Sequence, residues 1–599
     1  MASDPHLLAR IHNRMQRGDL AGALTAIEQL AAANPDDGPT WHLAGIIRRR
    51  AGQSVAAVSA LKQAIANGFV TAEVWNALGL AQEETGALTE AVKAFDAAAA
   101  ADPDYIPALT NGSRVLSMLD EHERAIDLVG QAIQRHPGSV QLNNALAAAH
   151  SAAGNQALAV DLYRQALAMD PANKIAAIRL GQVLREQGHA NQAVAHFSSI
   201  HSRFSGSPEV SDAMAGALIE AGRPHEGEAL LEQVCVSSPN YFAAHRAIAR
   251  LAREYDTGKD PYRTYRELAR RWPTEPTIWH EWLAVMMQYR DYTDALPVID
   301  QALHHTGDSA HLRLVQAMAL SELGQREAAE QLFRQLGDEN TPAGQALLIA
   351  RARNALSLGD AELARKLSQK ATTRRPEDQF GWAYLGLAWR MLGDEREFWL
   401  FDYDKQVQQI ALPTLCDPAT LAALNDRLRL LHTATSHPPD QSLRGGTQTE
   451  GDLFRRAETE IRSLRDDIRG VAQAHAAAMP DDPDHPLYRR KQARIRFAGS
   501  WSVRLTTAGF HIAHVHQNGW LSSALHLVVP PLQAGESGDA GALVLGAPPV
   551  ELGLCFAPRK IVRPRAGHLV LFPSAMWHAT LPFFGGSERL TVAFDALPA

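Results

Sequence analysis

Small and large apolar residues recur with a period of 34 residues between positions 91 and 197. The first series is Ala91, Ala125, Ala159 and Ala193, and the second is Phe95, Val129, Tyr163 and Phe197. Turn-forming residues precede each pair in the same phase, namely Gly86, Asp120, Gly154 and Gly188, and prolines follow at Pro103, Pro137 and Pro171. Glycine supplies turn conformations and proline ends helices. The pattern therefore predicts repeated pairs of antiparallel helices.

The clearest single unit reads Trp75-x2-Leu78-Gly79, Gly86, Ala91-x3-Phe95, Ala98 and Pro103. It resembles the tetratricopeptide (TPR) repeat. A small residue at Gly79 lets two helices approach closely, and Phe95 fills the space between repeats. Looser copies extend from about His6 to Trp382-x2-Leu385-Gly386, so we expect eleven or twelve repeats within residues 1–395. The resemblance implies a superhelix whose concave face binds a protein or peptide.

The period is lost after Trp389, and we expect residues 396–490 to form a helical connector that supports the C-terminal region. The apolar run Phe398–Tyr403 is expected to cap the last repeat. Two helical patterns come next, at Pro418–Thr433 and Glu450–Ala478. Prolines and glycines between them predict a loop at 436–449. Its polar side chains either face an active site or belong to a plain connection; they are Gln441, Arg444, Thr447 and Gln448.

From about Lys491 the pattern changes from helical to alternating. The expected strands are Ala493–Phe497, Trp501–Thr506, Phe510–His516, Ser522–Val529, Gly541–Leu545, Lys560–Val562, His568–Phe572, His578–Pro582 and Leu590–Phe594. Short strands with Gly and Pro turns and no intervening helices predict a small sandwich or barrel over residues 491–599.

Histidines on these strands are candidate metal ligands. Side chains two apart on a regular strand share a face, so His514 and His516 can reach one metal while His511 faces away. His578, on a later strand, can complete the set. Three ligands on one face, with open positions for cosubstrate and oxygen, are typical of non-haem iron(II) oxygenases.

An arginine and a threonine follow the last candidate ligand. Arg589 lies 11 residues after His578, on or just before the final strand. A guanidinium at that place can bind a carboxylate in bidentate fashion. Thr591 faces the same way and can donate a hydroxyl hydrogen bond. Together they suit the distal carboxylate of 2-oxoglutarate.

Residues 400–599 as a whole resemble 2-oxoglutarate and Fe(II)-dependent oxygenases of the prolyl-hydroxylase-like superfamily, and more narrowly the bacterial group fused behind TPR repeats. The segments that carry the narrower resemblance are His437-Pro438 to Gln448-Thr449, Gly499-Ser500-Trp501-Ser502-Val503-Arg504-Leu505, His514-Val515-His516 with Gly519-Trp520-Leu521-Ser522-Ser523, and Pro564 to His578. The resemblance implies Fe(II) chelated by 2-oxoglutarate, with ascorbate as a candidate reductant. The expected fold class is α + β multidomain: an N-terminal all-α TPR superhelix followed by a C-terminal double-stranded β-helix (jelly-roll) domain with flanking helices.

Two positions depart from the superfamily's pattern. His516 stands where the usual HxD motif has its carboxylate, so the metal would keep more positive charge. Leu525-His526 stands where related sequences have tyrosines that contact the cosubstrate. His526 is therefore a candidate for that contact, and Arg504 is a further candidate for binding an anion.

Charge and composition narrow the partners. A net charge of −8 argues against nucleic acid and against anionic membranes as partners. The N-terminus lacks a basic region followed by an apolar run, and no apolar stretch approaches the length of a membrane span. Cys235, Cys416 and Cys555 lie far apart and fit a reducing compartment. We therefore expect a cytoplasmic protein.

Three interpretations of function stay open. The first is a 2-oxoglutarate- and Fe(II)-dependent dioxygenase that hydroxylates a protein or peptide recruited by the repeats. The second is a three-histidine iron dioxygenase that does not use 2-oxoglutarate, against which Arg589 and Thr591 argue. The third is a TPR adaptor with an inactive barrel, against which the intact set of histidines argues. The iron site lies wholly downstream, so a chain without the residues before about Asp394 is expected to turn over 2-oxoglutarate without modifying its natural substrate.

Overall fold

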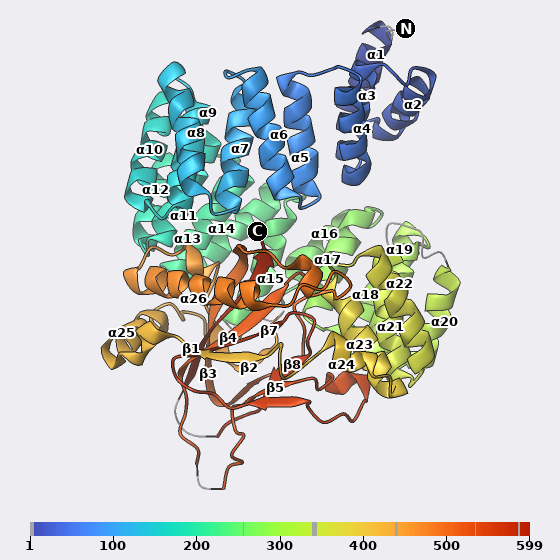
Figure 1. The fold of residues 1–599 in the computed structure, drawn as a ribbon, viewed down its shortest axis with the longest axis vertical. Coiled ribbons are helices and arrows are strands. Elements are labelled where there is room, and N and C mark those ends of the chain that lie inside the picture. The colour runs from blue at the N-terminus through green and yellow to red at the C-terminus, as the bar shows by residue number, and fades with distance from the viewer. Residues whose placement is uncertain (1–4, 256, 338–343, 438–440, 534, 585–587) are drawn as a thin grey trace. The chain divides into compact units, whose positions relative to one another are not determined.

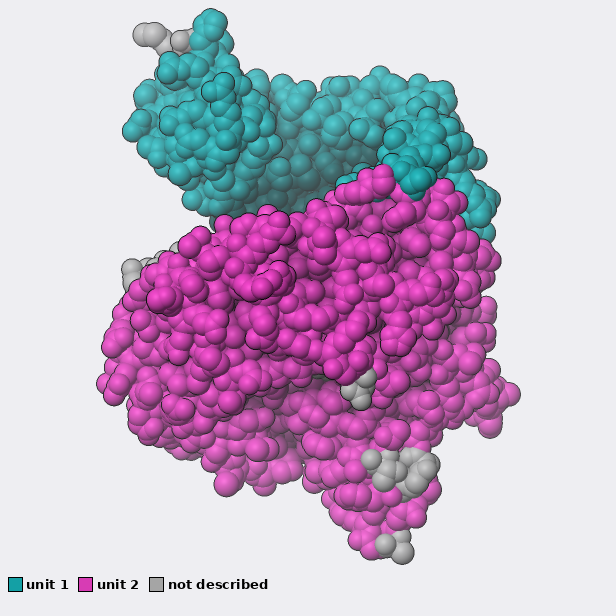
Figure 2. Space-filling model, turned by 180° about the vertical axis from the view of Figure 1, so that it is seen from behind, with its two compact units in different colours: residues 1–187, 202–204, 599 teal, residues 188–201, 205–598 magenta. Residues whose placement is uncertain are grey.

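The computed structural model describes residues 5–255, 257–337, 344–437, 441–533, 535–584 and 588–599 (Figure 1). The chain forms two compact units, coloured separately in Figure 2. The first comprises Met1–Gln187 with Ser202–Phe204 and Ala599, and the second comprises Gly188–His201 and Ser205–Pro598. The second unit therefore contains both helical repeats and the strands of the C-terminal region. Among the described residues, no helix combines the length and apolar character that a membrane span requires.

The first unit is a stack of antiparallel helix pairs. Its helices are α1 (Pro5–Gln16), α2 (Leu20–Ala33), α3 (Gly38–Arg50), α4 (Ser54–Ala66), α5 (Ala72–Glu84), α6 (Leu88–Ala101), α7 (Ile106–Met118), α8 (His122–Arg135), α9 (Val140–Ala152), α10 (Gln156–Met169) and α11 (Lys174–Glu186). The repeat positions have the expected roles. A Cβ placed on Gly79 of α5 would lie 2.6 Å from the Phe95 ring of α6. Asp120 (φ 59°) has the same left-handed backbone conformation as Gly86 (φ 79°) in the preceding repeat.

We expect Gly79→Ala to destabilise the first unit and Gly130→Ala to stabilise it. The new methyl group at position 79 would overlap the buried Phe95 ring, and such overpacking costs about 1–3 kcal/mol. Gly130 lies inside α8, where an added Cβ would have no atom within 4 Å, so alanine should gain about 0.5–1 kcal/mol there. Denaturant unfolding of both variants measures the two effects. If Gly79→Ala raised the free energy of unfolding as Gly130→Ala does, the close approach of α5 and α6 would not depend on the small residue at Gly79.

The second unit continues the repeats. Its helices in this region are α12 (Ala190–Ile200), α13 (Pro208–Glu220), α14 (Pro224–Ser237), α15 (Phe242–Glu254), α16 (Arg263–Arg271), α17 (Pro276–Gln288), α18 (Tyr292–Thr306), α19 (Ala310–Glu322), α20 (Arg326–Leu336), α21 (Gly344–Ser357), α22 (Ala361–Arg374), α23 (Gln379–Leu392) and α24 (Arg396–Leu400). In the run Phe398–Tyr403 that was expected to cap the last repeat, Phe398 and Trp399 are exposed, and Phe401 packs against α23. It is 4% exposed, and a Cβ on Gly386 would lie 2.6 Å from its ring, as at Gly79 and Phe95.

Two antiparallel sheets follow. Their strands are β1 (Gln408–Ala411), β2 (Leu443–Gln448), β3 (Ile495–His511), β4 (Leu521–Val528), β5 (Leu543–Leu545), β6 (Lys560–Val562), β7 (His568–Pro573), β8 (His578–Thr580) and β9 (Arg589–Pro598). The larger sheet has the order β1-β7-β4-β9-β3-β2 and the smaller has the order β6-β5-β8. The expected fold class, a TPR array followed by a jelly-roll with flanking helices, is confirmed.

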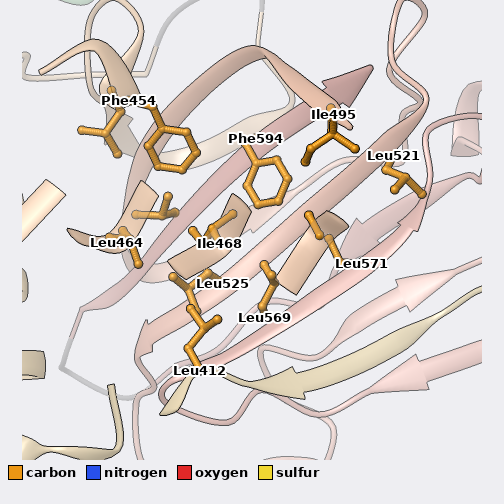
Figure 3. Close-up of a cluster of buried hydrophobic side chains, with 14 of the residues drawn as sticks. Leu412, Phe454, Leu464, Ile468, Ile495, Leu521, Leu525, Leu569, Leu571 and Phe594 are labelled. Atoms are coloured by element: carbon orange, nitrogen blue, oxygen red, sulfur yellow. The ribbon is translucent and has the colours of Figure 1, made fainter. Parts of the chain in front are cut away.

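The outer face of the larger sheet is covered by the connector helices α25 (Pro418–Arg429) and α26 (Thr459–Ala478). Short 3₁₀ turns lie in the same connector at Pro413–Cys416, Leu453–Arg455 and Tyr488–Arg490, and a further one, Val550–Leu552, packs against α21. Figure 3 shows the resulting core, in which Leu464 and Ile468 of α26 meet Leu525 and Phe594 of the sheet. The covered part of the outer face is therefore apolar.

Several of the expected elements have different boundaries. The predicted strands Ala493–Phe497 and Trp501–Thr506 form one strand, β3, because the glycine between them marks a β-bulge rather than a turn. β2 runs through the predicted loop 436–449, since Gly445 (φ 72°) lies at a bulge of an edge strand. The predicted strand Phe510–His516 is wrong: β3 ends at His511, and only a single bridge at His514 follows.

Candidate metal centre

Strand β9 separates two environments by simple alternation. Its even-numbered residues pack in the outer core, namely Leu590, Val592, Phe594 and Ala596. Its odd-numbered residues line a cavity of about 580 Å³ on the inner side, namely Arg589, Thr591, Ala593 and Asp595. One regular strand therefore supplies most of the polar side chains along one wall of the cavity.

Three histidines converge in this cavity. His514 and His578 face each other across an isolated bridge, with backbone N–H to oxygen distances of 3.0 and 3.1 Å in the two directions. His516 is tied by its own N–H to the carbonyl of Ser574, 3.1 Å away. The ring centroids lie 4.1, 5.0 and 5.1 Å apart. One nitrogen from each ring lies within 4.8 Å of the others, as a shared metal ion requires.

Hydrogen bonds at Nδ1 decide which nitrogen each ring presents. The three partners of Nδ1 are the carbonyl of Ile512 for His514 (2.8 Å), the carbonyl of Met576 for His578 (3.0 Å) and the carboxylate of Asp595 for His516 (2.6 Å). Carbonyl and carboxylate oxygens only accept, so each Nδ1 carries the proton and each Nε2 keeps its lone pair. This pattern is the one found for histidines that bind metals through Nε2.

Burial keeps two of these imidazoles neutral. Burial, followed by the nearby His516, lowers the pKa of His514 to about 3. Burial, followed by the neighbouring histidines, likewise holds the pKa of His578 well below its usual value. Neutral imidazole is the form that binds a metal, so no proton has to be removed at neutral pH.

His511 also lines the cavity, against expectation. The alternation argument fails there because the regular strand ends at His511 and the following residues change direction. Its Nδ1 lies 3.0 Å from Oγ of Ser442, and the same hydroxyl is 3.2 Å from Nε2 of His514. His511 is not part of the group whose ligand atoms converge.

Arg589 is a buried cation at one end of the cavity, with 2% of its surface exposed. Burial lowers the pKa of its guanidinium to about 10, so it stays charged at neutral pH. Within the described ranges, neither Nε nor Nη1 has a hydrogen-bond partner, and no carboxylate pairs with the side chain. An uncompensated buried charge is costly, so this arrangement indicates a site for an anion.

Thr591 and His526 flank this arginine. The two residues are opposite each other in the pairing of β9 with β4, and Thr591 lines the cavity. His526 is fully buried, and its Nδ1 lies 3.5 Å from Nη2 of Arg589. In the described part of the chain its Nε2 has no partner. Burial, followed by the charge of Arg589, keeps the pKa of His526 well below its usual value.

Two proposed site residues are not among those that line the cavity: His526, which contacts Arg589 from behind, and Arg504. Arg504 points away from the cavity altogether. It alternates with the cavity-lining Val503 on β3 and therefore faces the other way. Its Nε donates to Glu588 over 2.5 Å, and Glu588 also accepts from Arg429 over 2.6 Å. Its charge is thus already neutralised.

The polar residues of the 436–449 segment divide in the same way. Gln441 and Gln448 line the cavity, as does Ser442. Thr447 instead bonds the ring of His432, and Arg444 donates to backbone carbonyls of its own segment. Residues 438–440 lie outside the described ranges.

Sequence reasoning missed Asp595 and the contribution of the repeats. Asp595 shares its strand face with Arg589 and Thr591, and that even spacing is a signal that was available. Arg290 and Phe380, which also line the cavity, come from the turn after α17 and from α23. No local pattern distinguishes them from other repeat residues.

A second cavity of about 510 Å³ adjoins the first, and Arg290, Phe380, His514, Val515 and Gln517 line both. The rest of its lining comes mostly from helices α17 to α23, with Trp577 beside the strands. The repeats of the second unit therefore form part of the surroundings of the three histidines.

Comparison with protein families agrees with this architecture. Residues 499–595 match the family described as "Putative 2OG-Fe(II) oxygenase", where 2OG is 2-oxoglutarate. Residues 42–106, 118–174 and 150–215 match tetratricopeptide repeat families. The chain thus carries TPR repeats in its N-terminal part and a domain of this oxygenase family at its C-terminal end. No curated protein matches the chain.

Solved structures similar to the chain include TPR proteins from three bacteria. A tetratricopeptide repeat protein from Parabacteroides merdae ATCC 43184 is 14% identical, with a TM-score of 0.35, over 40% of this chain and 96% of that one. The C-terminal part of a TPR repeat-containing protein from Cytophaga hutchinsonii is 11% identical, with a TM-score of 0.31, over 40% and 99%. A thermophilic TPR protein in Thermus thermophilus is 18% identical, with a TM-score of 0.26, over 29% and 94%.

Proposed function

We propose that this protein is a 2-oxoglutarate- and Fe(II)-dependent dioxygenase that hydroxylates a protein or peptide held by its repeats. The observation that carries the proposal is one cavity containing both three converging Nε2 lone pairs and an unpaired buried guanidinium. The first feature suits a metal and the second suits the distal carboxylate of a cosubstrate. The membership of residues 499–595 in an oxygenase family supports the same assignment.

The roles follow from these positions. His514, His516 and His578 would hold the iron, while Arg589 with Thr591 and His526 would hold 2-oxoglutarate. With iron and 2-oxoglutarate bound and O2 as the oxidant, the site would hydroxylate an unactivated C–H group, one oxygen atom entering the substrate and the other entering succinate as 2-oxoglutarate loses carbon dioxide. Ascorbate is the proposed reductant. The chain itself orients the reactants and excludes water, a task to which the wall residue Phe572 contributes; its ring lies 4.7 Å from that of His578.

We assign recruitment of the substrate to the concave face of the repeats. The second cavity supports this assignment because it connects helices α17 to α23 with the histidines. Its charged residues are largely paired with one another, as in Arg353 with Glu322 and Arg290 with Glu551. An uncharged, largely apolar segment of polypeptide would therefore suit it best. The proposal keeps the division into repeats (1–395), connector (396–490) and oxygenase core (491–599), and a cytoplasmic location, which three free cysteines fit.

Incubation of the purified protein with Fe(II), 2-oxoglutarate and a cell lysate tests the proposal. We expect succinate to form and one lysate protein to gain the mass of a single oxygen atom. His578→Ala should abolish both and weaken Fe(II) binding by at least about 100-fold, because losing a ligand exceeds the loss of an outer-shell partner. His568→Ala is the matched control, since this strand histidine lies outside the group. Equal turnover by both variants would contradict the assignment.

A further inference from the structure

The proposed ligand set carries no charge of its own. Iron sites of this kind usually combine two histidines with one carboxylate, which offsets part of the metal's charge. Here the third ligand would be His516, and three neutral imidazoles offset none of it. Affinity and reactivity both depend on that charge, so its source matters.

Asp595 lies directly behind His516. Its two carboxylate oxygens are 2.6 and 2.7 Å from Nδ1 of that ring. Ser522 donates its hydroxyl to the same carboxylate over 2.7 Å, and Ser574 in turn lies 2.9 Å from Ser522. Only 17% of the Asp595 side chain is exposed, and within the described ranges its one ionic partner is His516.

The three histidines differ in the group that accepts the hydrogen bond from Nδ1. Nδ1 of His514 and of His578 donates to a neutral backbone carbonyl. Only His516, the residue at the carboxylate position of the motif, donates to a carboxylate. A merely structural need for an acceptor would be met by a carbonyl, as it is in the other two rings.

We propose that Asp595 supplies the negative charge of the metal site through His516. This inference rests on the proposed function. A carboxylate behind an imidazole fixes the tautomer and ring orientation and increases the ring's basicity toward the metal. Three histidines with Asp595 have the same net charge as two histidines with a direct carboxylate. Asp595 is thus a positioning residue that acts through His516.

Asp595→Asn is the first test, because it keeps the size and an acceptor oxygen but removes the charge. Anaerobic titration with Fe(II), monitored by a competing chelator, should show about 10- to 100-fold weaker binding. The thermal midpoint of the metal-free Asp595→Asn variant should equal that of the control variant Asp539→Asn. Asp539 is an acid that pairs with Arg563 away from the cavity. Ser522→Ala, which leaves the charge in place, should weaken binding less.

Restoring the charge at the ligand itself is the second test. In the Asp595→Asn background, His516→Asp should recover much of the lost Fe(II) affinity. In the parent, the same substitution places two carboxylates side by side and should not raise the Fe(II) affinity. Parental affinity in Asp595→Asn, or equal effects of His516→Asp in both backgrounds, would overturn the inference alone. Absence of Fe(II) binding by the parent would overturn the proposed function together with it.

Discussion

Arg589→Ala is expected to weaken 2-oxoglutarate binding by about 2–5 kcal/mol, the cost of breaking a buried charge pair. This corresponds to roughly 30-fold to several thousand-fold in affinity. The guanidinium is buried, charged at neutral pH and without a carboxylate partner in the described residues, so the cosubstrate would be its counter-ion. Calorimetric titration of 2-oxoglutarate into anaerobic Fe(II)-loaded protein measures the loss. Fe(II) binding itself should survive, since the arginine is not a ligand.

The chain offers a matched control for this variant. Arg504→Ala removes an arginine from a neighbouring strand whose charge is already paired with Glu588 outside the cavity, so cosubstrate affinity should not change. Arg589→Lys should recover only part of the loss, because an ammonium cannot reproduce two parallel hydrogen bonds. If Arg589→Ala binds 2-oxoglutarate as well as the parent does, the three-histidine dioxygenase that needs no 2-oxoglutarate becomes the leading interpretation.

The fold was largely predictable because its two halves obey different periods. A 34-residue spacing identified the repeats, and alternation located most strands of the larger sheet. Strands β1 and β2 were missed because their pairing partners lie far away in sequence, in β7 and β3. The glycines in β2 suggested a loop, although the backbone there needs a bulge.

The site was predictable where the backbone is regular. Alternation correctly groups Arg589 with Thr591, since β9 is paired on both sides and keeps its register next to β3 over this stretch. It fails at His511, where the strand ends. Side chains brought by other elements, such as Arg290 from the repeats, follow only from tertiary packing. The outward direction of Arg504 was within reach of the same argument, which places it opposite Val503.

The packing of the repeats against the strands contradicts the expectation that the oxygenase turns over 2-oxoglutarate without the residues before about Asp394. Val515 and Trp577, the neighbours of the three histidines, lie in one apolar core with α21, α22 and α23. The indole of Trp577 donates to the carbonyl of Ala383 over 3.3 Å, and the N–H of Gln379 donates to the carbonyl of Gln517 over 3.1 Å. The last repeats therefore form a wall of the oxygenase and are not merely attached to it.

A chain that lacks residues 1–395 is accordingly expected to lose the fold of the oxygenase, and with it all turnover of 2-oxoglutarate. Exposing a large apolar side chain costs roughly 1.5–3 kcal/mol, so a few of them equal the 5–15 kcal/mol that stabilises a typical domain. A chain that begins at Gly188 loses residues 1–187, which are nearly all of the first unit, and should keep its fold and its turnover. Circular dichroism and succinate release compare the two. Folded, active protein from the shorter chain would show that α21 to α23 are only a tether.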